Sequence, residues 1–71
     1  MKRSNLSQVL RLHKIVQSFF SEGYIYKVNS PNFGYIKLQH MRNQNIIDIK
    51  FNEEKILVFK NKKLIKHETC N

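Results

Sequence analysis

Hydrophobic residues recur with a helical period near the start of the chain. At 100° per residue, the apolar positions of this segment fall on one side of a helix and cover an arc of about 220°. Asn5 is a favourable N-cap, Gln8 follows three residues later as in a capping box, and Gly23 is a typical residue after a helix end. The pattern therefore predicts an amphipathic helix over residues 5–22.

After Gly23 the hydrophobic period changes to two, which is typical of strands buried on one face. Short polar segments separate the runs that we predict to be strands: Tyr24–Val28, Phe33–Met41, Ile46–Phe51, Ile56–Lys60 and the short Leu64–His67. The first of these polar segments, residues 29–32, is predicted to be a turn, and Asn61 and Lys62 are a candidate two-residue hairpin turn. Because all the connections are short, we expect an antiparallel meander.

The predicted fold is therefore α+β: an N-terminal amphipathic helix packed on a four- to five-stranded antiparallel meander sheet. Residues 1–71 make one domain, with its β half at residues 24–67. Alternation along the strands sets the expected faces. Tyr24, Tyr26 and Val28 share a face, and Tyr35 shares one with Lys37, opposite Ile36 and Leu38.

The apolar arc of the helix is wider than one sheet needs. A surface helix usually requires an apolar stripe of only about 100° or somewhat more. A chain of 71 residues is also near the lower size limit for an independent core, and oligomerisation is a common remedy. We therefore expect a homo-oligomer that associates through the helix face or through a sheet edge.

The charge of the chain is strongly unbalanced. Thirteen Lys and Arg residues face five Asp and Glu residues, which gives a net charge of +8. Such a surplus attracts phosphates, anionic lipids or acidic proteins. The residues that we expect to bind nucleic acid through phosphates, with Tyr35 stacking on an unpaired base, are Arg11, Lys14, Tyr35, Lys37, Lys50, Lys60, Lys62, Lys63 and Lys66.

Two of these assignments have a simpler alternative. The lysines from Lys60 to Lys66 can instead protect an edge hairpin from aggregation. The positive charge as a whole can serve solubility alone. Tyr24 and Tyr26 are interpreted as core or interface residues rather than stacking residues, because they share a face with Val28.

Groups for catalysis and for metal binding are scarce. His13, His40 and His67 are not spaced as metal ligands, and the two glycines cannot form a phosphate loop. We expect no cofactor and no enzymatic activity; a metal-independent ribonuclease that uses His40 or His67 is the catalytic route left open. Cys70 is the single cysteine, so neither an internal disulfide nor a cysteine-based zinc site can form.

The absence of a disulfide favours a reducing compartment, and we expect a cytoplasmic protein. No apolar run approaches the roughly 18 residues of a membrane span. Residues 1–21 lack acids and carry four basic residues, a composition also typical of mitochondrial targeting helices. We interpret them as the first helix of the fold, because the sheet has little else to pack on.

The layout of one helix followed by short antiparallel strands, together with residues 25–29, 36–39 and 56–61, resembles the Sm-like (Lsm/Hfq) family of RNA-binding proteins. Lys66-His67 is similar to the lysine–histidine pair that contacts uridine in that family, and Gln8 is similar to its helix glutamine. The resemblance implies that Gln8, Lys66 and His67 bind RNA and that subunits close into a ring by strand pairing. Departures are His40 at an expected glycine and Ile65 at an expected tyrosine.

The sequence as a whole favours a small non-catalytic binding protein, with nucleic acid as its partner and RNA ahead of DNA. The alternative is a protein-binding inhibitor or adaptor of the kind that phages and mobile elements encode, docked on an acidic or nucleic-acid-binding surface. A membrane-surface role for the cationic helix is a further alternative.

Overall fold

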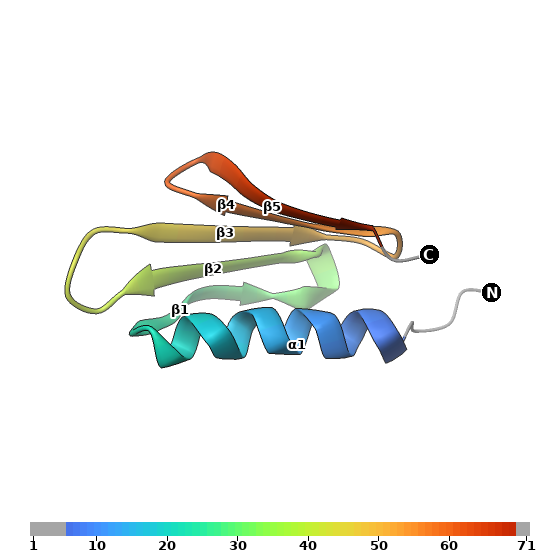
Figure 1. Cartoon of the computed structure of the whole chain (residues 1–71), viewed down its shortest axis with the longest axis horizontal. Coiled ribbons are helices and arrows are strands. Elements are labelled where there is room, and N and C mark those ends of the chain that lie inside the picture. The colour runs from blue at the N-terminus through green and yellow to red at the C-terminus, as the bar shows by residue number, and fades with distance from the viewer. Residues whose placement is uncertain (1–5, 70–71) are drawn as a thin grey trace.

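The computed structural model describes residues 6–69, and for residues 6–8 it describes the backbone alone. Helix α1 (Leu6–Ser21) is followed by a five-stranded antiparallel sheet whose strands lie in chain order (Figure 1). The strands are β1 (Tyr24–Ser30), β2 (Tyr35–His40), β3 (Ile46–Phe51), β4 (Lys55–Lys60) and β5 (Lys63–Thr69). The predicted α+β fold with a meander sheet is confirmed.

The connection between β1 and β2 differs from the predicted turn at residues 29–32. Asn29 and Ser30 pair with Ile36 and Tyr35 and so extend β1, while the chain turns in a 3-10 helix, Pro31–Phe33. The alternation predicted that Phe33 begins the second strand, but β2 begins at Tyr35. Proline fixes its own φ and lacks an N–H, so it fits the first turn of a short helix better than a strand.

Gly34 closes this connection and needs to be glycine. Its φ is 68°, in the left-handed region, and a Cβ at this position would lie 2.2 Å from the main-chain oxygen of Phe51. The Phe51 N–H donates to the Gly34 oxygen at 2.9 Å, which holds the start of β2 against the end of β3. Gly34 thereby fixes the point at which β2 begins and the face on which Tyr35 lies.

A β-bulge between Tyr26 and Val28 corrects one predicted face. Tyr26 pairs with Leu38, whose side chain is buried, whereas Val28 pairs with Lys37 on the opposite face. The extra residue of a bulge shifts the alternation by one position. Tyr24 and Tyr26 thus share a face, as predicted, but Val28 does not share it.

The core lies between α1 and one face of the sheet. Side chains with no exposed surface come from the three central strands: Leu38, Ile47, Ile49, Ile56 and Val58. Ile15 and Val16 of α1, Tyr24 of β1 and Ile36 of β2 complete this cluster, and Leu12, Phe19, Phe20 and Phe51 pack around it. We call the sheet face that α1 covers the inner face, and the opposite face the outer face.

Helix α1 is fixed to both edges of the sheet. On the β1 side, Phe20 makes an edge-to-face contact with Tyr26, with ring centroids 5.0 Å apart. On the β5 side, Arg11 Nη1 donates a hydrogen bond to the main-chain oxygen of Thr69 at 3.2 Å. Val9 and Leu10 keep 51% and 54% of their surface exposed, so part of the wide apolar arc stays uncovered. The predicted cap at Asn5 lies outside the described residues.

His40 joins the end of the helix to the turn after β2. The Arg42 N–H donates to Nδ1 at 3.0 Å, so in the neutral ring Nε2 carries the proton and donates to the main-chain oxygen of Glu22, 2.8 Å away. The ring also makes an edge-to-face contact with Tyr24. Both ring nitrogen atoms of His40 thus form hydrogen bonds that hold the fold together.

The predicted hairpin turn at Asn61 and Lys62 is present. Their φ values of 52° and 71° are both left-handed, as in the primed turns that suit hairpin twist. Asn61 tolerates this conformation and fixes the turn, because its Oδ1 accepts from the Ile46 N–H at 2.9 Å. Lys62 has no such compensation and is a lysine in a conformation that favours glycine.

Candidate nucleic-acid interface

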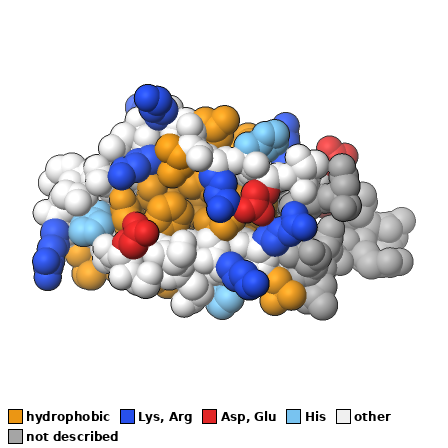
Figure 2. Space-filling view, viewed as in Figure 1, with side chains coloured by type: hydrophobic (Ala, Val, Ile, Leu, Met, Phe, Trp, Pro, Cys, Tyr) orange, Lys and Arg blue, Asp and Glu red, His pale blue; other side chains and the backbone are white. Residues whose placement is uncertain are grey.

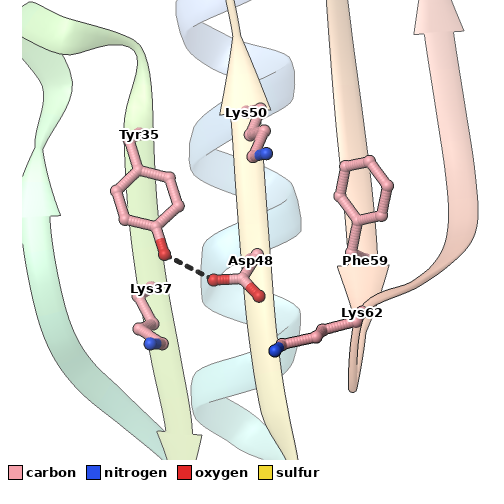
Figure 3. A pocket seen from close by; sticks show the side chains of 6 residues that line it. All are labelled: Tyr35, Lys37, Asp48, Lys50, Phe59 and Lys62. Atoms are coloured by element: carbon pink, nitrogen blue, oxygen red, sulfur yellow. Dashed lines mark hydrogen bonds between the residues drawn. The ribbon is translucent and has the colours of Figure 1, made fainter.

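An open groove of about 440 Å³ lies on the outer face of the sheet. We call it the outer groove; its lining comes from β2, β3, β4 and the last turn, and consists of Tyr35, Lys37, Asp48, Lys50, Phe59 and Lys62 (Figure 3). Strand pairing explains this grouping, because Lys37 and Phe59 both lie opposite Asp48 on neighbouring strands. The alternation that buries Leu38, Ile47 and Val58 directs their sequence neighbours outward.

The Tyr35 ring is held in place at one side of the outer groove. Its hydroxyl donates to Asp48 Oδ1 at 2.5 Å. This hydrogen bond, followed by burial and the negative charge of Asp48, raises the pKa of Tyr35 from its ordinary value of 10.0 to about 12. The phenol therefore stays protonated and fixed, which keeps the ring in one orientation.

Phe59 supplies a second ring, on the other side of Asp48. Figure 3 shows the rings of Tyr35 and Phe59 with their faces turned toward the viewer, on the outer side of the sheet. Lys50 Nζ lies 5.5 Å from the centre of the Phe59 ring, a cation–π distance. Phe59 was not among the predicted site residues, because residues 56–59 are all apolar; its position next to Val58 was the signal that places it on the outer face.

The cations of the outer groove are available to a ligand. Lys50 and Lys62 are exposed and Lys37 is half-buried. Within residues 6–69 these three lysines form no ion pair, and Asp48 is the single acid that lines the groove with them. Three cations beside two ring faces can hold phosphates while bases stack.

A second group of cations lies between α1 and β5. This open groove of about 360 Å³, which we call the helix groove, is lined by Arg11, Lys14, Ile15, Ser18, Phe19, Lys66 and Glu68. Two of its three cations already have partners in the fold: Arg11 bonds Thr69, and Lys66 Nζ lies 3.4 Å from Glu68 Oε2. Lys14 is the cation without a hydrogen bond or an ion pair in the part of the chain that the structure describes.

The other predicted residues lie in different places, and among them Lys66 alone lines a groove, the helix groove. Lys60 and Lys63 are exposed and pair with each other beside the turn. Lys66 pairs with the buried Val58 and lies toward the inner face, whereas His67 pairs with Leu57 and lies on the outer face. The side chain of Gln8 lies outside the described part of the chain. The predicted site is thus divided between two grooves and a hairpin.

Figure 2 shows one face on which hydrophobic side chains gather at the centre, with Lys and Arg side chains around them. Among residues 6–69 no group of His, Cys, Asp and Glu side chains could hold a metal ion. The same residues contain no helix with the length and hydrophobicity that crossing a membrane requires.

Comparisons with protein-family models, with curated proteins and with solved structures found no match to this chain. The resemblance to the Sm-like family stays a prediction. Assignment of a function therefore depends on the geometry of the two grooves.

Proposed function

We propose that the protein binds single-stranded nucleic acid across the outer face of its sheet, with RNA ahead of DNA. The observation that carries the proposal is the outer groove, in which two aromatic rings lie beside three lysines that have no ion-pair partner in the described chain. A sheet face with exposed aromatics is a common way to recognise unpaired RNA bases.

The spacing of the rings favours a single strand over a duplex. Tyr35 and Phe59 lie two strands apart in the sheet and are offset by two positions along it, because Tyr35 pairs with Lys50 and Phe59 with Asp48. Standard sheet spacings then separate their backbones by about 12 Å. Stacked bases in a helix rise by only ~3.4 Å each, so an extended, unstacked strand suits both rings better.

The lysines complete this path. Lys50 and Lys62 lie on either side of Phe59 in Figure 3, and Lys37 lies beyond Tyr35 on β2. Phosphates on both sides of the stacked bases can thus meet a cation. Neutralising phosphates releases counterions, which makes the affinity fall as salt rises.

The test is fluorescence anisotropy with a labelled RNA of mixed sequence and about 12 nucleotides, matched to the site size of small single-strand-binding domains. We expect saturable binding that weakens with salt, and weaker binding of the same RNA as a duplex.

Phe59→Leu keeps the apolar bulk but removes the ring, so affinity should fall roughly fivefold or more. Lys55→Gln is the matched control, since Lys55 lies on β4 but lines neither groove. Binding that does not change between low and high salt contradicts the proposal.

The second candidate is a protein partner at helix α1, with another copy of this chain first among them. The observation that favours it is the exposure of Val9 and Leu10, each about half exposed on a helix that otherwise packs on the core. Light scattering with and without RNA tests it, with Leu10→Lys as the variant. A dimer that Leu10→Lys dissociates supports this candidate; a monomer in both conditions contradicts self-association.

A further inference from the structure

One acid lies at the centre of a groove that is otherwise basic. Asp48 stands between the two rings, and its Oδ1 accepts the hydrogen bond from Tyr35. Its Oδ2 has no hydrogen-bond partner among residues 6–69, and Figure 3 shows this oxygen pointing away from Tyr35, toward the side on which Lys62 lies. The carboxylate therefore presents one fixed, unused acceptor to whatever occupies the groove.

Asp48 also lies at the border between the outer groove and a second hollow. It lines a neighbouring hollow of about 290 Å³ together with Lys37, Ile46, Asn61 and Lys62. Three residues, Lys37, Asp48 and Lys62, line both hollows. A strand that passes from one hollow to the other therefore crosses the border that these three residues form.

An ionised carboxylate has acceptors and no donor, so it repels a phosphate and attracts an N–H group. Phosphates should accordingly follow the lysines, and the position next to Oδ2 should hold a base edge. Exocyclic amino groups project from cytosine, adenine and guanine and can donate to a single oxygen. Uracil has a carbonyl oxygen where cytosine carries its amino group, and its one Watson–Crick donor, N3–H, lies between the two carbonyl oxygens O2 and O4. A carboxylate that accepts from N3–H therefore faces both of these oxygens, which is unfavourable.

We propose that Asp48 makes the outer groove selective for nucleotides whose base carries an exocyclic amino group, against uracil. Tyr35 is a positioning residue in this proposal, because its hydroxyl holds Oδ1 and so directs Oδ2 outward. The inference rests on the proposed binding of single-stranded nucleic acid and adds the base that it prefers.

The experiment compares oligocytidine with oligouridine by anisotropy at one salt concentration, since the two probes have the same backbone and similar ring size. Wild-type protein should bind oligocytidine more tightly by roughly tenfold, the scale of one hydrogen bond to a charged group. Asp48→Asn keeps an acceptor for Tyr35 but can turn its amide N–H₂ outward, so it should bind the two probes within about twofold of each other.

Glu54→Gln is the matched control. It removes the same negative charge from the turn after β3, away from both grooves, and should keep the preference for oligocytidine.

Equal binding of the two probes by wild-type protein overturns the selectivity while leaving the proposed function intact. The selectivity is also overturned if Asp48→Asn and Glu54→Gln both bind each probe more tightly and by the same factor. The loss of one negative charge would then explain the effect of the Asp48 substitution. Wild-type protein that binds neither probe at low salt overturns the proposed function itself. If Asp48→Asn does not fold, the wild-type comparison still decides.

Discussion

The outer groove and the helix groove contain the same number of cationic side chains, three each, but use them differently. In the helix groove, Arg11 and Lys66 are engaged with Thr69 and Glu68, so they help to hold α1 and β5 in place. In the outer groove, the lysines surround two ring faces and have no ion-pair partner in the described chain. Positive charge alone therefore does not identify a binding surface; what matters is whether the fold already uses the cations.

Neutralising each set of three cations should separate the two grooves most strongly. The triple variant Lys37→Gln, Lys50→Gln and Lys62→Gln removes up to three phosphate contacts. The slope of log affinity against log salt should become shallower by about 2, and affinity at low salt should fall on the order of 100-fold. The matched triple Arg11→Gln, Lys14→Gln and Lys66→Gln should change both quantities much less. Equal losses in salt-dependent anisotropy titrations would show that both grooves bind.

Lys62→Gly should move stability and affinity in opposite directions. Glycine at a φ of 71° relieves the left-handed strain of a lysine, so the free energy of unfolding should rise by about 1 kcal/mol and the melting temperature by ~4–8 °C. Affinity for single-stranded RNA should fall roughly threefold to tenfold, because one phosphate contact is lost. Lys63→Gln, at the neighbouring position outside both grooves, should leave both quantities nearly unchanged. Unchanged affinity in Lys62→Gly excludes Lys62 from the interface.

Arg11→Met should affect stability and leave RNA binding nearly unchanged. The variant keeps an apolar stem but removes the hydrogen bond to Thr69, so urea unfolding should show a loss of about 0.5–1 kcal/mol. Lys37→Met is the comparison in the outer groove, with little change in stability and weaker binding. A loss of affinity in Arg11→Met without a loss of stability would reverse the assignment of roles.

The alkaline titration of Tyr35 has the smallest effect on the comparison of the two grooves, because it tests a single hydrogen bond within the outer groove. The folded protein binds this proton more tightly than the unfolded chain, because the pKa is raised from 10.0 to about 12. The resulting stabilisation is fully present below pH 10 and is lost as pH rises from 10 to 12. Tyrosinate absorbance should show one tyrosine titrating near 12 in wild-type protein. Tyr35→Phe should lack that step and its share of the stability loss in this pH range; a wild-type titration in which no tyrosine titrates near 12 contradicts the bond to Asp48.

Much of this fold could be predicted from the sequence, because its elements follow simple local rules. Alternation fixed β3 at Ile46–Phe51, and Asn61 with Lys62 marked the last turn correctly. The errors arose where one residue interrupts the alternation. Pro31 moved the first turn and extended β1, and the bulge moved Val28 to the outer face. Periodicity cannot reveal a bulge, since the extra residue is set by pairing with another strand.

The candidate site was predictable in part. Tyr35 and Lys37 were assigned to one face correctly, because they lie at alternate positions of one strand. Lys50, which was also among the predicted binding residues, lies opposite Tyr35 on the adjacent strand. Phe59 was missed, and Arg11 and Lys66 were grouped with the other cations. Which cations have partners depends on contacts between residues distant in the chain, such as Arg11 with Thr69. Composition and spacing contain no information about such contacts.

The two outermost strands both carry an irregularity: the bulge of β1 at Tyr26 and Val28, and a register shift in β5 opposite Val58 and Phe59. Such irregularities twist an edge and interrupt its row of regularly spaced donors and acceptors. A regular edge would offer a template on which further chains could add strand by strand. Both edges of this small sheet are irregular, which should raise the barrier to fibril growth. Any assembly of copies should therefore use side-chain contacts at the exposed part of α1.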